Sequence, residues 1–176
     1  MGLGKTHQAM ALIDAASQAN PLAAIFIVCP TSVLFHWQEK LHKFLPGVKV
    51  HTFYGNTRSL THFHHTKGIL LTSYGIARNE IDQLSSIHFD AIIMDEIQVA
   101  KNHQSRVHNA LASLQARMRL GLSGTPIENH LRELKSLFDL TLPSYLPSEG
   151  DFRDYFVKPI EKENNIPRRL LLTKLI

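Results

Sequence analysis

The 176-residue sequence contains a single cysteine, Cys29, and aromatic residues make up only 8% of it. One cysteine excludes an internal disulfide framework and fits the reducing environment of the cytosol. The sequence also lacks any apolar run close to the ~20 residues that a bilayer span needs. No basic segment precedes an apolar stretch near the N-terminus, so a signal peptide is not predicted. We therefore expect no membrane partner.

Charged residues are also few, at 19% of the chain, and they nearly balance, with a formal net charge of +4. A weakly basic balance is compatible with nucleic-acid binding, but ordinary surface lysines explain it equally well. Hydrophobic residues make up 44% of the chain, which is typical of a globular protein and argues against disorder. The length is sufficient for one ordinary domain with a substantial core.

Short apolar runs alternate with helical patterns along the first three quarters of the chain. The apolar runs suit strands buried on both faces, and they lie at residues 23–29, 48–54, 68–73, 89–94 and 118–123. Apolar residues at helical spacing predict helices over residues 34–44, 107–114 and 131–140. This alternation predicts the α/β class, with a parallel sheet covered on both sides. In such sheets ligands bind beyond the carboxyl ends of the strands.

The first six residues, MGLGKT, match the end of a phosphate-binding loop, G-x-x-x-x-G-K-[ST]. Backbone N–H groups in such a loop, together with the N-terminus of the following helix, hold phosphate oxygens. Lys5 is expected to reach the β- and γ-phosphates, and the Thr6 hydroxyl to hold Mg²⁺. The first position of the pattern would lie upstream of Met1, so we expect it and the lead-in strand to be missing. The predicted nucleotide-binding residues of this loop are Gly2, Leu3, Gly4, Lys5 and Thr6.

A second motif, IIMDE, is an apolar strand that ends in two acids, Asp95 and Glu96. A strand that delivers an aspartate to Mg²⁺ opposite a phosphate-binding loop is the Walker B arrangement. The adjacent Glu96 can then orient and deprotonate the attacking water. Alone, two acids at a strand end are more often simply exposed, but the lysine 90 positions earlier favours catalysis. Lys5, Asp95 and Glu96 are therefore the predicted catalytic residues, and Thr6 and Asp95 the predicted metal ligands.

Five segments, in order, carry a resemblance to a known family: GLGKTHQ, IVCPTSVLFHWQEKLHKFLPGVKVHTFYG, ILLTSYGIARNEIDQL, IIMDEIQVAKN and GLSGTPIENHLRELKSLFDLTLPSYLP. With them the chain resembles the first RecA-like lobe of the Swi/Snf-type ATPases of helicase superfamily two. The resemblance implies a RecA-like, three-layer P-loop lobe over residues 1–142, without its first strand, and a proline-punctuated helical extension over residues 143–176. It also implies ATP hydrolysis coupled to movement along double-stranded DNA, with ATP and Mg²⁺ as cofactors.

The resemblance assigns a coupling role to the residues that follow the acids and the last predicted strand. Gln98 would join the γ-phosphate region to the family's third motif. That third motif corresponds to Ser123, Gly124 and Thr125, and in the family it couples hydrolysis to DNA contact.

Two further segments would contact the DNA backbone by the same resemblance. They are Pro30, Thr31 and Ser32 after one predicted strand, and Thr72, Ser73 and Tyr74 after another. Hydroxyls and loop N–H groups can hold phosphates without reading bases. DNA binding is therefore expected to depend weakly on base sequence and strongly on salt.

The family also uses parts that this sequence does not contain, namely a second RecA-like lobe with an arginine finger and an upstream adenine-recognition segment. An arginine finger contributes roughly 10³–10⁵ in rate, so the isolated chain is expected to hydrolyse ATP very slowly. Without the buried side chains of the lead-in strand, it is also expected to be marginally stable. The bacterial branch further implies RNA polymerase or another DNA-bound complex as a partner. The expected location is the bacterial cytoplasm, at the nucleoid, or the nucleus of a eukaryote.

An alternative is a fragment of a split or decayed gene that is catalytically silent and at most binds nucleic acid or a partner weakly. A small P-loop kinase or GTPase fits less well, because the SGTP segment and the proline-punctuated tail do not suit it. The remaining conspicuous residues have structural interpretations. Trp37 and Cys29 are expected in the core, Arg117 and Arg119 on a solvated surface, and His62, His64 and His65 in a solvated turn and not at a zinc site.

Overall fold

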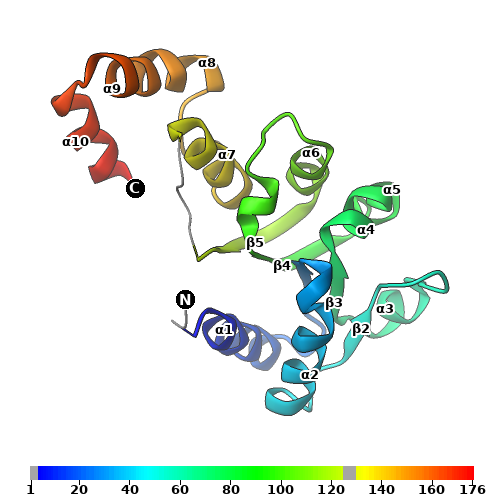
Figure 1. The fold of residues 1–176 in the computed structure, drawn as a ribbon. Helices are drawn as coiled ribbons and strands as arrows, with labels where there is room; N and C mark the ends of the chain where they lie inside the picture. Colours follow the sequence, from blue (N-terminus) through cyan, green and yellow to red (C-terminus); the bar gives the residue numbers. More distant parts are fainter. Residues whose placement is uncertain (1–3, 125–129) are drawn as a thin grey trace.

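A computed structural model describes residues 4–124 and 130–176 of the chain. These residues contain a five-stranded sheet with the order β2-β3-β1-β4-β5, in which every neighbouring pair is parallel (Figure 1). The strands are β1 (Ala24–Cys29), β2 (Val50–Thr52), β3 (Gly68–Ser73), β4 (His88–Asp95) and β5 (Gln115–Leu122). The predicted α/β class and parallel sheet are confirmed, and each predicted strand is present with slightly different ends. Within the described residues no strand precedes the first helix.

Helices cover both faces of the sheet (Figure 1). One face carries α1 (Lys5–Ala19) and α2 (Leu34–Phe44). The other carries α3 (Thr61–Thr66), α4 (Tyr74–Asn79), α5 (Ile81–Leu84), α6 (Arg106–Ser113) and α7 (Leu131–Thr141). Successive side chains of a strand point to opposite faces, so Phe26 and Val28 join one core layer while Ile25 and Ile27 join the other. The fold is therefore a sheet between two helical layers.

The central strands are buried throughout, whereas β5 is not. All six residues of β1 are buried, because this strand has neighbours on both sides and helices on both faces. Among the described strands β5 pairs only with β4, and its Met118 is 37% exposed. The apolar run 23–29 was therefore easy to recognise in the sequence, while the mixed sequence of β5 was recognised only over its second half.

Close contacts at the amino end of the sheet set the positions of the first residues of the strands. Gly68 has φ +98°, and a Cβ built on it would lie 2.5 Å from the Lys49 carbonyl oxygen. Only glycine combines this left-handed backbone with so close an approach. Nearby, the Asp90 carboxylate accepts a hydrogen bond of 2.9 Å from the backbone N–H of Ala24. The first contact places the start of β3 against the residue before β2, and the second joins the start of β1 to β4.

Arg119 on β5 corrects one expectation, since it is half-buried and not simply solvated. Its guanidinium donates hydrogen bonds to the carbonyl oxygens of Leu111 at 3.0 Å and Leu140 at 3.2 Å, and also to that of Leu114. These carbonyls lie at the ends of α6 and α7, where helical partners run out. Arg119 therefore holds two helix ends against the sheet, while Arg117 remains exposed.

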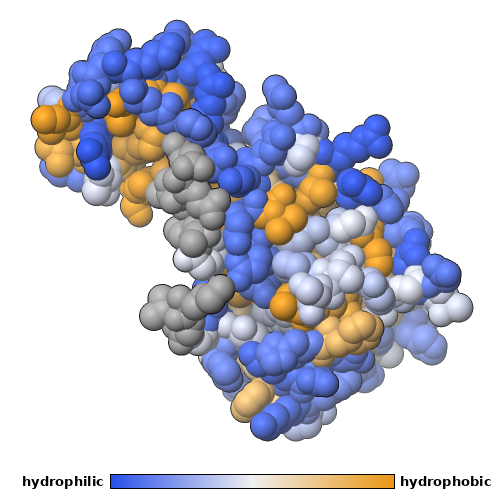
Figure 2. Space-filling model, in the orientation of Figure 1, coloured by the Kyte–Doolittle hydropathy of each residue, from blue (hydrophilic) through white to orange (hydrophobic). Residues whose placement is uncertain are grey.

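The last part of the chain forms a small helical group with a core of its own. It comprises α8 (Glu149–Phe152), the single π-helical turn η3 (Arg153–Val157), α9 (Lys158–Glu163) and α10 (Ile166–Leu175). Phe152, Phe156 and Leu172 are buried together, and Phe138 of α7 packs against them. Apolar surface also remains exposed over these helices (Figure 2). No helix in the described part of the chain is long and apolar enough to cross a membrane.

Candidate nucleotide-binding site

A pocket of about 410 Å³ opens at the carboxyl end of the sheet, between α1, α2 and the end of β4. Parallel strands end together at this edge, which is where α/β folds bind ligands. The pocket brings together the predicted phosphate-binding and acidic groups from opposite ends of the first hundred residues. Its lining comprises Gly4, Lys5, Thr6, His7, Val33, His36, Trp37, Lys40, Asp95 and Glu96.

The first turn of α1 forms the phosphate-facing wall of this pocket. Gly4 has a left-handed backbone, with φ 67°, and α1 begins at the next residue. The 15-residue helix therefore directs the positive end of its dipole toward the pocket. A Cβ built on Gly124 would lie 3.4 Å from Lys5 Nζ, so the residues after β5 approach the same ammonium group. Of the predicted loop residues, Gly2 and Leu3 lie outside the described part of the chain.

Asp95 ends β4 with both carboxylate oxygens already hydrogen-bonded. Trp37 Nε1 donates to Oδ2 at 2.7 Å, and the backbone N–H of Glu96 donates to Oδ1 at 3.1 Å. The hydroxyl of Tyr74 donates to the Asp95 carbonyl oxygen at 2.8 Å. An ionised carboxylate has about four acceptor sites, so two remain for another ligand. Asp95 is 9% exposed, and it is therefore held firmly while still facing the pocket.

The oxygen donors of the pocket suit Mg²⁺ with a nucleotide. Magnesium is usually bound through one or two carboxylates together with substrate phosphates. Asp95 and the Thr6 hydroxyl would hold the ion, and Lys5 would contact the phosphates. No cluster of three or more His, Cys, Asp or Glu side chains is arranged to hold a metal by itself within residues 4–124 and 130–176. The donor set thus fits a metal that arrives with its substrate.

Glu96 lies at the start of a hydrogen-bonded relay to the end of β5. It has a left-handed backbone, with φ 50°, between β4 and the 3₁₀ turn η2 (Ile97–Ala100). Gln98 Nε2 donates to Glu96 Oε2 at 2.6 Å, and Ser123 Oγ donates to Gln98 Oε1 at 2.8 Å. The side chain of Gln98 therefore connects the predicted base to the predicted coupling motif. Of that motif, Thr125 lies outside the described residues.

Close packing sets the geometry of this relay. A Cβ on Gly121 of β5 would lie 2.7 Å from Ile97 Cδ1 and 2.9 Å from Thr141 Cγ2. The absence of a side chain at residue 121 therefore lets η2 lie directly on β5. That approach is what brings Gln98 within reach of Ser123.

The two segments predicted to contact DNA differ in exposure. Thr31 and Ser32 are exposed at the start of η1 (Thr31–Val33), directly after β1, and they are free to meet a phosphate backbone. Thr72 and Tyr74 are buried, and their hydroxyls bond inside the protein, to the carbonyl oxygens of Phe53 and Asp95. Ser73 caps α4 through the N–H of Ile76. The DNA contact of this second segment stays a prediction. In the structure its three hydroxyls bond to the Phe53 carbonyl, the first turn of α4 and the Asp95 carbonyl.

Trp37 and Cys29 lie in the core as predicted, but they differ in what they contact. Burial raises the pKa of the Cys29 thiol to about 12, with a further contribution from the Asp95 charge, so the thiol is protonated and unreactive. The hydrogen bond from Trp37 to Asp95 was missed by sequence reasoning. The available signal was general, because a buried indole N–H usually finds an acceptor.

Comparisons with known proteins agree with this geometry. The family model described as the SNF2-related domain matches residues 1–175. The TATA-binding protein-associated factor mot1 of Schizosaccharomyces pombe is 34% identical over 91% of the chain, and the Mycoplasma genitalium protein described as ATP-dependent helicase MG018 is 37% identical over 94%. The Sulfolobus solfataricus SWI2/SNF2 ATPase core in complex with double-stranded DNA superposes with a TM-score of 0.86, at 34% identity over 97% of the chain.

The chain is much shorter than each of these relatives. It spans 9% of the length of mot1 and 16% of the length of the Mycoplasma protein. It covers 36% of the Sulfolobus ATPase core. The similarity therefore concerns one lobe of larger proteins.

Proposed function

The chain belongs to the SNF2-related family, and from this premise we propose that it is the ATP-binding lobe of a DNA-dependent ATPase. In this proposal the lobe couples ATP hydrolysis to movement along double-stranded DNA once a second RecA-like lobe faces it. Support comes from the relatives described as ATP-dependent helicases and from the Sulfolobus core that was solved with double-stranded DNA.

The observation that carries the proposal is the convergence of Lys5, Thr6, Asp95 and Glu96 on one pocket. An ammonium, a hydroxyl and two carboxylates come from residues 90 positions apart and meet at the end of a parallel sheet. This is the set of groups that phosphoryl transfer from ATP to water requires.

Each residue of the pocket then has a distinct task. Lys5 and the N-terminus of α1 bind the β- and γ-phosphates and stabilise the charge that moves onto them. Thr6 and Asp95 would hold Mg²⁺, which would neutralise phosphate charge when bound. Glu96 accepts a proton from the attacking water, and Gln98 holds the Glu96 carboxylate in position by its hydrogen bond of 2.6 Å.

The DNA partner would be held through its phosphates. Thr31 and Ser32 are exposed near the pocket, and Lys40 on α2 lines it. Contacts of this kind carry little base information, and they weaken as salt rises. The second RecA-like lobe, RNA polymerase or another DNA-bound complex, and a location at DNA in the cytoplasm or the nucleus all belong to this proposal.

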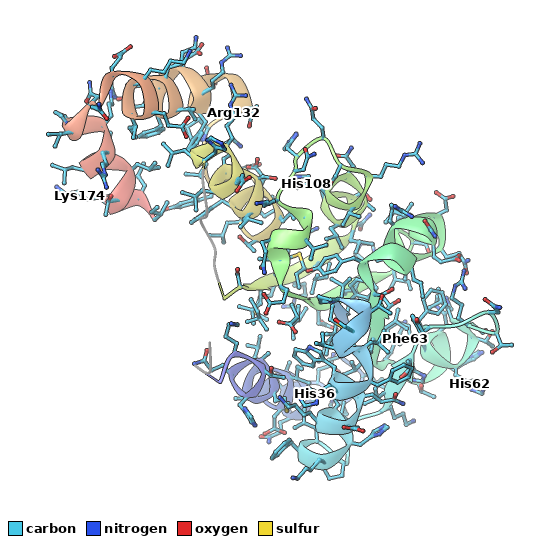
Figure 3. All side chains as sticks on the ribbon, viewed as in Figure 1. His36, His62, Phe63, His108, Arg132 and Lys174 are labelled. Atoms are coloured by element: carbon cyan, nitrogen blue, oxygen red, sulfur yellow. The ribbon has the colours of Figure 1, made fainter. Side chains whose placement is uncertain are left out.

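Nucleotide binding by the 176-residue chain is the direct test. We expect Lys5→Ala to weaken binding of the fluorescent analogue mant-ADP, with Mg²⁺ present, by about tenfold or more. A hydrogen bond to a charged group contributes roughly 1.5–3 kcal/mol, which corresponds to that range. Lys174→Ala is the matched control, because Lys174 lies on α10, far from the pocket (Figure 3). Equal affinities of both variants and the unmodified chain would contradict the proposal.

A turnover experiment tests the DNA requirement. In a protein that carries this chain together with a second RecA-like lobe, we expect duplex DNA to stimulate ATP hydrolysis and Lys5→Ala to abolish it. Hydrolysis that persists in the variant would contradict the assignment of this pocket. Binding of nucleotide without any stimulation by DNA would favour the alternative of a silent binding module.

A further inference from the structure

We propose that Trp37 is a positioning residue for the metal-binding carboxylate of Asp95, and that α2 links this carboxylate to the exposed segment before the helix. The inference rests on the proposed function, because it assigns Asp95 to Mg²⁺. It goes beyond that function by naming the group that orients the ligand and the element through which DNA contact would reach it.

The contact is short, buried and specific. Trp37 Nε1 donates to Asp95 Oδ2 at 2.7 Å, and Trp37 is 1% exposed. An indole N–H has a single proton to donate, and in a dry environment it keeps the acceptor it has found. Groups that hydrogen-bond a metal-ligating carboxylate fix its orientation, and their loss typically lowers metal affinity or activity by about 10- to 100-fold.

Trp37 is also the side chain that decides the rotation of the carboxylate. Among the described residues, the other donor to the Asp95 carboxylate oxygens is the N–H of the next residue, Glu96, at 3.1 Å. Because that N–H belongs to the adjacent residue, it moves together with the backbone of Asp95 and does not fix the carboxylate relative to the rest of the pocket. The torsion that rotates an aspartate carboxylate is soft and roughly two-fold. A donor from another element, 58 residues away in sequence, is therefore the restraint that selects one orientation in the pocket.

The helix that carries Trp37 begins directly after the exposed segment. In η1 (Thr31–Val33) Thr31 and Ser32 are exposed, and the N–H of Leu34 bonds back to the Thr31 carbonyl, so the 3₁₀ turn runs straight into α2. Leu34 and Leu41 are fully buried, which anchors the helix in the core. His36, Trp37 and Lys40 of α2 form one wall of the pocket, and Figure 3 shows His36 beside α1. A phosphate that engaged Thr31 or Ser32 would thus act on the element that holds Asp95.

The chain provides its own reporter, because Trp37 is its single tryptophan. We expect MgCl₂, added alone or with unlabelled ADP, to change the intensity or wavelength of Trp37 emission in the unmodified 176-residue chain. Asp95→Asn, which keeps an oxygen for the indole but removes the negative charge, should abolish this response. An emission spectrum that stays the same while Mg²⁺ promotes mant-ADP binding would overturn the inference and leave the proposed function intact.

A substitution then separates positioning from packing. Trp37→Phe keeps a buried ring and removes the N–H, and we expect the Mg²⁺ concentration for half-maximal mant-ADP binding to rise about tenfold. Phe63→Leu is the matched control, since it opens space in the opposite core layer (Figure 3). It should lower the melting temperature without moving the Mg²⁺ midpoint.

The outcomes distinguish the two proposals. A Mg²⁺ midpoint that is unchanged in Trp37→Phe, or that shifts equally in Phe63→Leu, would overturn the positioning role. Failure of the unmodified chain to bind mant-ADP at any Mg²⁺ concentration would instead overturn the proposed function, and the inference with it. If Trp37→Phe does not fold, the Mg²⁺ response of Trp37 emission decides alone.

Discussion

The two ends of the same parallel sheet are built on opposite principles. At the amino end, polar groups complete the backbone: the Asp90 carboxylate accepts from the N–H of Ala24, and Arg119 donates to three helix carbonyls. At the carboxyl end, the Asp95 and Glu96 carboxylates accept hydrogen bonds from the side chains of Trp37 and Gln98, and both still face a pocket. One end therefore maintains the fold, and the other keeps acceptor sites available for a ligand.

This difference predicts that substitutions at the two ends affect different properties of the protein. Changes at the carboxyl end that keep the shape of the side chain should alter nucleotide chemistry and leave the free energy of unfolding nearly unchanged. Changes at the amino end should lower that free energy and leave the pocket as it is.

Glu96→Gln should have the largest effect on turnover. The amide keeps an oxygen that can accept from Gln98, but it cannot take a proton from water. We expect ATP hydrolysis, measured in a protein that also has a second lobe, to fall by about 10²- to 10⁴-fold. Binding of mant-ADP and the melting temperature should change little. A variant that unfolds would show that the two ends are not separable.

Gly68→Ala should have the largest effect on stability. The new Cβ would meet the Lys49 carbonyl oxygen at 2.5 Å, and the backbone has φ +98°. Left-handed strain costs about 1–3 kcal/mol and overpacking a further 1–3 kcal/mol, so urea denaturation should show a loss of about 3 kcal/mol.

Two glycines provide controls for that measurement. Gly55→Ala adds a Cβ at φ +81° with nothing within 4 Å, so it should show the strain alone. Gly47→Ala has open space and an ordinary φ, and it should be nearly neutral. A ranking other than Gly68, Gly55, Gly47 would contradict the packing described at the amino end.

Cys29 should show the smallest effect, although it ends β1 close to Asp95. Burial and the Asp95 charge raise the pKa of its thiol to about 12, so the reactive thiolate is scarce at pH 8. We expect mass spectrometry to detect almost no alkylation by iodoacetamide in the folded chain at this pH, and complete alkylation in denaturant. Because the folded-state pKa is raised above the ordinary value of 9.0, stability should fall as pH rises from about 9 toward 12. Rapid labelling of the folded chain would show that the carboxyl end is more open than described.

The sequence predicted the sheet well because its central strands are buried on both faces. The run that became β1 is apolar without interruption, and the acids at residues 95 and 96 follow a similar run. Together with the phosphate-binding loop pattern at Lys5, these strand ends predicted that the acids and the lysine would meet. Contacts between elements distant in sequence could not be anticipated. From the sequence Arg119 was expected on the surface, because nothing in the local pattern shows that the ends of α6 and α7 lie beside it. Likewise, the bond from Trp37 to Asp95 depends on how α2 lies across the sheet.

The left-handed backbone at Glu96 limits how far the free energy of unfolding can be raised without changing the pocket. A residue with a Cβ in this conformation costs about 1–2 kcal/mol relative to an ordinary helical backbone, and glycine would avoid most of it. A glycine at residue 96 would therefore raise the free energy of unfolding, but it would also remove the carboxylate that we propose accepts a proton from water. Stability and the proposed catalytic role therefore favour different residues at position 96, and efforts to stabilise the protein should keep Glu96.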